Sequence, residues 1–209
     1  MTKTAGVGPN AGWGPAVDSP ATHHRTIARA VMFAARAHDG ETRQDAGDAY
    51  VNHLAEVACI CAGLEPFDPV LVAACYLHDA IEDTAVTETV LRAEFGDEIA
   101  DLVMDVTDPP DLKGRERRER QVSHTAAAGP RVKRLKLADK ISNVEELIGI
   151  QARRFKVKAN ARYLDWARRV VDVCRDVEPA LDARFDASAR RLEAEIDRHR
   201  TRKHAHDPR

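Results

Sequence analysis

The chain has 209 residues, which is enough for one well-buried domain. Charged residues make up 32% of it but the net charge is only −2, so the surface carries both signs and the composition calls for neither a nucleic-acid partner nor a membrane. No run approaches the roughly 20 apolar residues of a membrane span, and the N-terminus lacks the basic-then-apolar pattern of a signal peptide. We therefore expect a cytoplasmic protein.

Helical signals follow one another along nearly the whole chain. Residues 1–20 are rich in Gly, Pro, Ala and Thr and are predicted to be a flexible tail, in which Trp13 is the one feature that could dock. No segment alternates like a strand and no repeat is found, so we predict an all-α domain over residues 21–199 and a basic, frayed tail over residues 200–209. Apolar spacing, N-caps and helix-ending glycines predict helices over about residues 22–38, 52–62, 70–84, 88–95, 99–106, 113–120, 131–148, 159–175 and 179–199.

The cysteines lie in these apolar, helical stretches and include no Cys-x-x-Cys pair. A zinc knuckle or a disulfide framework is therefore not expected. We interpret all four as small core residues: Cys59, Cys61, Cys75 and Cys174.

Residues 70–84 form an apolar helical run that turns abruptly acidic. On one helix, His78 lies a turn from Glu82, and Asp79 lies a turn from Asp83. Buried carboxylates are costly and repel one another, so a cation is the simplest way to hold this group together. Taken alone, the motif fits equally well a helix end whose charges are solvated.

Two further residues favour the metal site. His53 falls in the first turn of the second predicted helix, and Asp139 lies in the helix over residues 131–148. Two imidazoles and two carboxylates make a mixed nitrogen and oxygen ligand set, for which we expect Mn²⁺, with Fe²⁺ and Zn²⁺ as alternatives. Such an ion lowers the pKa of bound water and polarises a phosphoryl group, as hydrolysis of a phosphate ester requires.

The acidic pair Glu82 and Asp83 stands one turn beyond His78 and Asp79. We interpret the pair as the base that takes the proton from the attacking water, without deciding between the two residues. The alternative is a supporting role, in which they hydrogen-bond a ligand histidine and fix its tautomer.

Other side chains could contact a phosphorylated substrate. Arg43, on a predicted loop, offers a planar charged fork to a phosphate, although a lone loop arginine is more often solvated. Asn143 could reach a sugar hydroxyl or a base edge, or it could cap a neighbouring loop. We rank Tyr163 as a possible contact and Trp166 as a core residue. The charged run over residues 113–120 is interpreted as a solvated helix rather than a phosphate-binding edge.

The order of these motifs resembles a known family, the HD-superfamily phosphohydrolases, and within it the stand-alone alarmone hydrolases related to RelA/SpoT and to the metazoan SpoT homologue. The resemblance spans residues 22–195. The segments that carry it are FAARAH (33–38), YVNH (50–53), LHDAIEDT (77–84), FG (95–96), VTD (106–108) and LKLADKISN (135–143).

The resemblance implies an HD-domain helical bundle whose partner is a nucleotide. The implied reaction removes the 3′-pyrophosphate from guanosine tetraphosphate or pentaphosphate, (p)ppGpp, and gives GDP or GTP and pyrophosphate. The implied residues are His53, His78, Asp79 and Asp139 for Mn²⁺, Glu82 and Asp83 for the water, and Arg43, Tyr50, Asn143 and Tyr163 for the substrate.

One departure from the family's pattern concerns the substrate. Close relatives carry Lys after Val-Thr-Asp-Asp, where this chain has Pro109 and Pro110, so a phosphate contact is missing or comes from Lys113 or Arg115.

One alternative function keeps the chemistry but acts on (p)ppApp or on the 2′-phosphate of NADPH. Another is a catalytically silent nucleotide-binding module, which the presence of both acidic residues at 82 and 83 disfavours. The sequence carries no signal for an oligomeric state.

Overall fold

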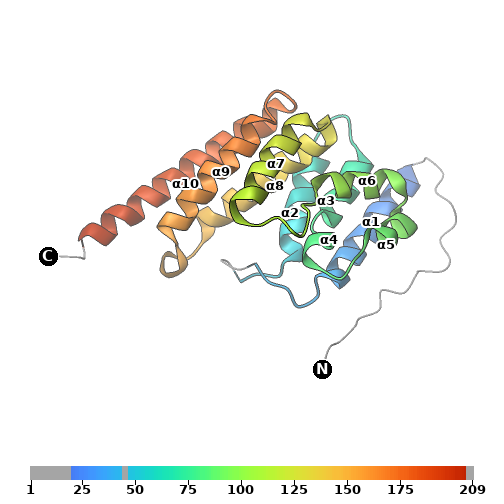
Figure 1. Cartoon of the computed structure of the whole chain (residues 1–209), viewed down its shortest axis with the longest axis horizontal. Helices are drawn as coiled ribbons and strands as arrows, with labels where there is room; N and C mark the ends of the chain where they lie inside the picture. The colour runs from blue at the N-terminus through green and yellow to red at the C-terminus, as the bar shows by residue number, and fades with distance from the viewer. Residues whose placement is uncertain (1–19, 44–46, 206–209) are drawn as a thin grey trace.

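The computed structural model describes residues 20–43 and 47–205. Within them it contains helices and no β-strand, apart from an isolated bridge between Thr42 and Ala49, which confirms the all-α prediction (Figure 1). The predicted tail with Trp13 falls almost entirely outside the described residues. The elements are α1 (Pro20–Ala37), α2 (Val51–Ala62), α3 (Pro69–Leu77), α4 (Ala80–Asp83), α5 (Glu88–Phe95), α6 (Asp97–Val106), α7 (Gly114–Ala127), α8 (Pro130–Gly149), the 3₁₀ turn η1 (Ala152–Arg154), α9 (Val157–Asp172) and α10 (Pro179–Ala205).

Local signals in the sequence set several helix ends. The Asp68 carboxylate caps α3 by accepting the backbone N–H groups of Val70 and Leu71, both at 3.1 Å, and proline occupies the first helical turn. Thr87 caps α5 more weakly, at 3.4 Å. Gly96 separates α5 from α6 with φ of 80°, a left-handed conformation that glycine adopts without a steric penalty.

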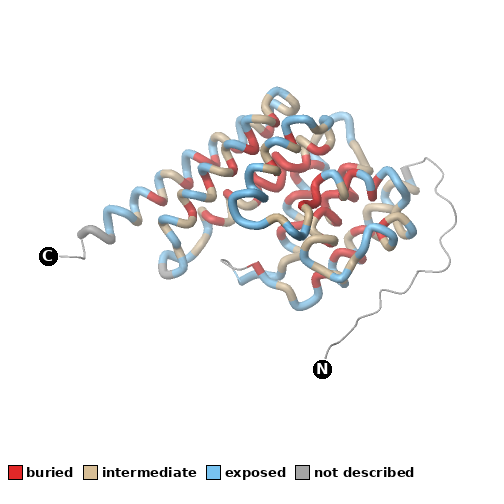
Figure 2. Tube along the Cα trace, viewed as in Figure 1, coloured by how far each residue is buried: buried red, intermediate tan, exposed pale blue. Residues whose placement is uncertain are grey.

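Helix α8 is the central element of the bundle. It packs against α2, α3 and α6 from the N-terminal half and against α9 and α10 from the C-terminal part, and α9 and α10 pack against each other. The buried positions gather where these helices meet (Figure 2), and they include the fully buried Leu54, Leu77 and Leu135. Each such leucine contributes about 1.5–3 kcal/mol through burial. The core thereby fixes the relative positions of α2, α3 and α8, the helices that carry or precede the predicted metal ligands.

The predicted helix over residues 70–84 is broken in two. Helix α3 ends at Leu77, His78 and Asp79 form a turn with helical dihedral angles, and the short α4 follows. The Asp83 N–H still donates to the Asp79 carbonyl at 2.9 Å. The prediction of one continuous helix was therefore wrong, although the acidic residues stay one turn beyond the His-Asp pair.

Three further expectations differ from the structure. Helix α10 continues to Ala205, beyond the predicted end at residue 199, and α7 continues to Ala127. Cys59 is exposed on α2, whereas Cys61, Cys75 and Cys174 are buried as expected. Across the part of the chain that the structure describes, none of the helices is both long and apolar enough to cross a bilayer.

Candidate active site

Two histidines and an aspartate from three segments meet where α2, the end of α3 and α8 converge. His53, His78 and Asp139 are all buried and each offers a ligand atom within 4.8 Å of the others. The His53 Nε2 lies 3.4 Å from the Asp139 carboxylate. The structure thus brings together residues that are 25 and 61 positions apart in the sequence.

The hydrogen bonds of the two imidazoles leave Nε2 as the ligand atom. His78 Nδ1 lies 2.8 Å from the Cys75 carbonyl, which can only accept, so the proton is on Nδ1. His53 Nδ1 lies 2.9 Å from the Ser142 hydroxyl, which donates its own proton to Glu56 at 2.6 Å and therefore accepts from the ring. Both rings then direct an Nε2 lone pair toward the cluster.

Asp79 completes the predicted ligand set. One of its carboxylate oxygens lies 3.1 Å from His78 Nε2 and 3.7 Å from His53 Nε2, and it accepts a hydrogen bond from the Tyr50 hydroxyl at 2.6 Å. Burial alone would raise the pKa of this carboxyl, but the two histidines hold it well below its ordinary range. Burial would likewise lower the pKa of His78, yet Asp79 and then Asp139 raise it to about 9.

The donor set fits a divalent cation. The buried His78 Nε2 has no hydrogen-bond partner among the described residues, which is costly unless another group takes its lone pair. Asp139 is also oriented from outside the cluster, because it accepts from Lys140 Nζ at 2.6 Å and from Asn143 at 2.5 Å. Burial opposes ionisation, but Lys140 and then His53 keep the pKa of Asp139 well below its usual value. Two imidazoles and two ionised carboxylates form an arrangement whose negative charge a bound cation would neutralise.

Glu82 is held in a fixed position beside this cluster. One carboxylate oxygen accepts the Asp108 backbone N–H at 2.6 Å, and the other forms an ion pair with Arg117. Burial raises the pKa of Glu82, and burial followed by the charge of Asp79 raises that of Asp83. Both carboxylates therefore hold a proton more readily than an ordinary surface carboxylate, as a general base near neutral pH requires.

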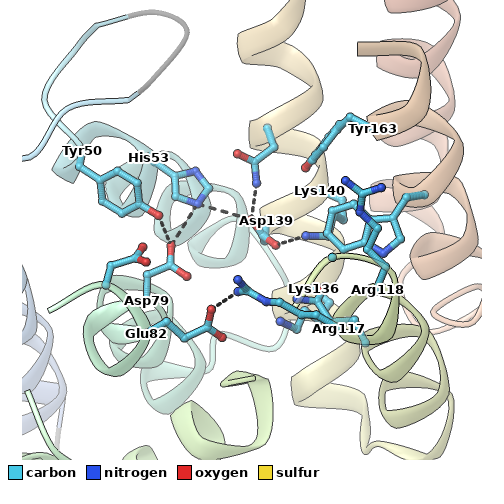
Figure 3. Close-up of a pocket in the computed structure, with 15 residues that line it drawn as sticks. Tyr50, His53, Asp79, Glu82, Arg117, Arg118, Lys136, Asp139, Lys140 and Tyr163 are labelled. Atoms are coloured by element: carbon cyan, nitrogen blue, oxygen red, sulfur yellow. Dashed lines mark hydrogen bonds and ion pairs between the residues drawn. The ribbon is translucent and has the colours of Figure 1, made fainter. Parts of the chain in front are cut away.

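A cavity of about 370 Å³ opens onto the cluster, with acidic groups on one side and cationic groups on the other (Figure 3). The acidic side carries Glu82, Asp83, Asp79 and Asp139. Facing it are Arg117 and Arg118 from α7 and Lys136 and Lys140 from α8. A phosphorylated molecule in this cavity would place its anionic oxygens against the cations and an ester bond near the histidines.

The two lysines of the cationic wall differ in their surroundings. Lys136 donates to the Val106 carbonyl at 2.8 Å, and burial followed by the charge of Lys140 lowers its pKa. Lys140 pairs with Asp139, and its ammonium lies 4.4 Å from the centre of the Trp166 ring. Burial would lower the pKa of Lys140, but Asp139 and Tyr163 raise it. Lys140 is therefore fixed as a cation at the boundary between the two walls.

Of the four predicted substrate contacts, three line the cavity. Tyr50 donates a hydrogen bond to Asp79, Asn143 donates one to Asp139, and Tyr163 lines the cavity from α9. Arg43 is not among the lining residues: its side chain is only 6% exposed and pairs with Glu56 at 2.8 Å and with Glu146 at 2.6 Å. The loop therefore buries this guanidinium instead of offering it to solvent or to a phosphate.

The sequence interpretation missed several residues of the cavity, including Lys136 and Lys140 of the cationic wall. Trp166 was expected in the core but lines the cavity, with its ring 5.4 Å from that of Tyr163. Arg117 and Arg118 belong to the charged run that was interpreted as solvated, while Lys113 and Arg115, the expected replacements for the missing lysine, do not line this cavity. Helical periodicity could have shown that residues 117, 118 and 121 share one face, but not which face turns inward.

Comparison with known proteins decides the family. A family model described as an HD domain matches residues 30–164, more than half of the chain. This chain belongs to the HD-domain family. All the cluster residues and both acidic residues of α4 fall inside the matched segment of this HD-domain protein.

Several curated relatives cover most of this HD-domain chain. Guanosine-3′,5′-bis(diphosphate) 3′-pyrophosphohydrolase MESH1 of Homo sapiens is 36% identical over 149 residues, 69% of this chain and 82% of the relative. The protein of the same name from Danio rerio is 33% identical over 157 residues, 74% and 87% of the two chains. A solved structure described as a metazoan orthologue of SpoT that hydrolyzes ppGpp matches with a TM-score of 0.71 and 29% identity, covering 84% of this chain and 97% of that one.

Proposed function

We propose that this HD-domain protein is a metal-dependent pyrophosphohydrolase that removes the 3′-pyrophosphate from (p)ppGpp and gives GDP or GTP and pyrophosphate. The observation that carries the proposal is the cavity with its two opposed walls: the His-His-Asp cluster with Asp79, Glu82 and Asp83 on one side, and four cations on the other. Relatives named for this reaction align with most of the chain, and their alignment supports the same substrate.

The metal would be held by His53, His78, Asp79 and Asp139. We favour Mn²⁺ because imidazole and carboxylate ligands suit it, with Fe²⁺ and Zn²⁺ as alternatives. When bound, a divalent ion supplies a Lewis acid for the phosphoryl group and lowers the pKa of water. The location proposed for the protein is the cytoplasm, where the alarmone nucleotides would be found.

The chain's own residues supply the other parts of the reaction. Water attacks the phosphorus that is linked to the 3′ oxygen, the bond between them breaks, and the 3′ oxygen leaves with a proton as a hydroxyl group. Glu82 or Asp83 takes the proton of the attacking water. Arg117 and Arg118 pair with the phosphate oxygens, and Asn143 and Tyr163 line the side of the cavity where the sugar and base would lie.

Product analysis with purified protein, Mn²⁺ and ppGpp tests the reaction. We expect equal amounts of GDP and pyrophosphate. Release of inorganic phosphate, or faster turnover of ppApp or of the 2′-phosphate of NADPH, would show that the site accepts another substrate. No turnover of any of these nucleotides by metal-loaded protein would favour a silent binding module and refute the proposed enzyme.

Two variants separate binding of the metal from the chemistry. Asp79→Ala removes a carboxylate that lies 3.1 Å from His78 Nε2, so we expect it to lose both bound metal and turnover. Glu82→Gln keeps the side-chain volume and should retain the metal while losing turnover by about 100-fold or more. Metal analysis by mass spectrometry, beside the rate, distinguishes them. Unchanged metal content in the Asp79 variant would contradict the ligand assignment.

A further inference from the structure

Arg43 is a buried cation that has no part in the reaction proposed above. Its guanidinium contacts two carboxylates from different helices, Glu56 of α2 at 2.8 Å and Glu146 of α8 at 2.6 Å. Burying a guanidinium is costly unless such partners offset the cost. Its backbone is fixed as well, because the N–H donates to the Asp48 carbonyl and the carbonyl accepts from the Gly47 N–H, both at 2.8 Å. The fold thus holds this side chain in one place.

The two partners of Arg43 lie on helix faces that carry proposed metal ligands. On α2, Glu56 lies three residues after His53, and on α8, Glu146 lies seven residues after Asp139. Both spacings place the two side chains on the same side of their helix. Arg43 therefore joins α2 to α8 beside the cluster.

A continuous chain of hydrogen bonds connects Arg43 to His53. Arg43 donates to one oxygen of Glu56 at 2.8 Å, and the Ser142 hydroxyl donates to the same oxygen at 2.6 Å. Ser142 has one proton to give, so toward His53 Nδ1, 2.9 Å away, it can only accept. The ring proton is then on Nδ1, and the Nε2 lone pair is directed toward the Asp139 carboxylate at 3.4 Å (Figure 3).

Glu56 is the member of this chain that needs support. Its side chain is half-exposed, so without Arg43 it would be free to turn toward water. Ser142 is buried and would then have to direct its proton elsewhere, and His53 Nδ1 lies within reach. If Ser142 donates to Nδ1, the proton of the neutral ring must be on Nε2, and Nε2 is the atom that the cation needs.

We propose that Arg43 is a positioning residue of the metal site: by holding Glu56 it fixes the direction of the hydrogen-bond chain, and with it the His53 tautomer whose Nε2 binds a divalent cation. The inference rests on the metal site of the proposed function. It gives Arg43 a role other than the phosphate contact expected from the sequence. Removing an outer partner of a ligand histidine typically lowers metal affinity by about 10- to 100-fold.

The affinity of the full chain for Mn²⁺, measured by isothermal titration calorimetry, is the first test. Arg43→Gln should bind Mn²⁺ about tenfold or more weakly than the unmodified chain, because Glu56 loses its partner. Arg43→Lys keeps the charge but not the planar fork, so it should recover only part of the loss. The matched control is Arg131→Gln: Arg131 also pairs with two carboxylates, Asp68 and Glu98, both at 2.6 Å, outside this hydrogen-bond chain. The control should bind Mn²⁺ like the unmodified chain.

The tautomer of His53 gives a second readout that needs neither metal nor substrate. Long-range ¹H–¹⁵N NMR spectra of the metal-free chain, at a pH where the ring is neutral, should show the proton on Nδ1. In Arg43→Gln the fraction with the proton on Nε2 should rise, which a general loss of stability would not cause. His53→Gln identifies the signals. Either an unchanged tautomer or an unchanged Mn²⁺ affinity in folded Arg43→Gln would overturn the proposal.

A double variant tests whether Arg43 acts through Ser142. Ser142→Ala removes the acceptor of His53 Nδ1 and should itself weaken Mn²⁺ binding. Adding Arg43→Gln should then cost little more, whereas the losses of two independent residues would add. Full additivity would refute the relay. If thermal melting shows that Arg43→Gln is unfolded, Arg43→Lys replaces it, with the same expected direction.

Turnover of ppGpp separates this inference from the proposed function. At saturating Mn²⁺, Arg43→Gln should recover most of the rate, with a KM for ppGpp within about twofold of that of the unmodified chain. Normal Mn²⁺ binding with a raised KM would show a phosphate contact and overturn the positioning role. If the unmodified chain binds Mn²⁺ but leaves ppGpp intact, the proposed reaction fails, while the Mn²⁺ and NMR results still decide the role of Arg43.

Discussion

At the scale of single residues, Arg117 connects the proposed base to the rest of the site. Its guanidinium pairs with Glu82 and also with Asp108 at 2.6 Å, so one side chain of α7 holds two carboxylates from other segments. A lysine would supply the charge but not the planar fork that reaches both. Arg117 therefore positions Glu82 in addition to contributing positive charge to the cavity.

We expect Arg117→Ala to lower kcat/KM for ppGpp by about tenfold or more while leaving the metal content unchanged, because Glu82 loses its orientation. Arg117→Lys should recover only part of the loss. The control is Arg115→Ala on the same helix, which does not line the cavity and should stay within about twofold of the unmodified chain. A full rate in Arg117→Ala would remove the positioning role.

Asp108 gives a pH dependence that can be measured without substrate. Its buried carboxylate accepts from Arg117, Arg120 and Gln121. Burial acts to raise its pKa, but Arg117 and Gln121 outweigh burial and lower it. Because the pKa is lower in the folded state, the stabilisation is present above the unfolded pKa of about 3.9 and is lost as pH falls through the folded value.

Asp108→Asn should accordingly unfold more easily than the unmodified chain at pH 7, by about 1–3 kcal/mol. The difference should shrink as the pH falls below about 4, since the native carboxylate then becomes protonated as well. Urea unfolding at several pH values measures this. Asp105→Asn, at an exposed position of α6, is the control and should change little at any pH. A constant difference across this range would exclude the proposed ionic stabilisation.

The convergence of His53, His78 and Asp139 could be predicted from the sequence because each of them lies in a short motif with its own apolar context. The cationic wall could not, because residues 113–120 contain several equivalent charges. The way α7 packs against α8 and α9 decides that Arg117 and Arg118 face the cavity. The burial of Arg43 could not be predicted from the sequence either, because Glu146, one of its two partners, lies more than 100 residues away in the sequence.

At the scale of elements, helix ends were predictable where one residue caps them and less so elsewhere. Asp68 and Pro69 correctly predicted the start of α3. The break after Leu77 could not be predicted, because no helix-breaking residue follows it in the sequence. Tertiary contacts at the cluster give the physical reason: His78 and Asp79 are held by the Cys75 carbonyl and the Tyr50 hydroxyl. A periodic pattern cannot report such contacts.

The cap of α3 leads to a prediction about stability. Asp68 caps the helix and also pairs with Arg131 of α8 at 2.6 Å, so Asp68→Ala should cost about 1–2 kcal/mol of unfolding free energy. Thr87→Ala removes a longer and exposed capping bond of α5 and should cost less. Chemical denaturation of both variants makes the comparison. An equal loss in the two would mean that the shorter bonds and the ion pair of Asp68 add nothing.

At the scale of the whole molecule, the proposed metal site lies where three separate parts of the bundle meet. His53 belongs to α2, His78 and Asp79 follow α3, and Asp139 belongs to α8. An ion held by all of them would link these parts in the folded chain and have no comparable site in the unfolded one. Binding of the metal should therefore stabilise the fold as well as support the reaction.

We expect Mn²⁺ at about 100 times its dissociation constant to add about 2.7 kcal/mol of stability, which corresponds to a rise in Tm of about 5–10 °C for a domain of this size. Chelation with EDTA should reverse the rise. Asp139→Asn lacks one of the proposed ligands, so its Tm should be almost the same with Mn²⁺ and with EDTA. Each variant is compared with itself in the two conditions, so an effect of the substitution on stability without metal does not enter the comparison. Differential scanning calorimetry measures both pairs of curves. If the unmodified chain melts at the same temperature with and without Mn²⁺, the four residues do not form the cation site; if Asp139→Asn keeps the full rise, Asp139 is not one of its ligands.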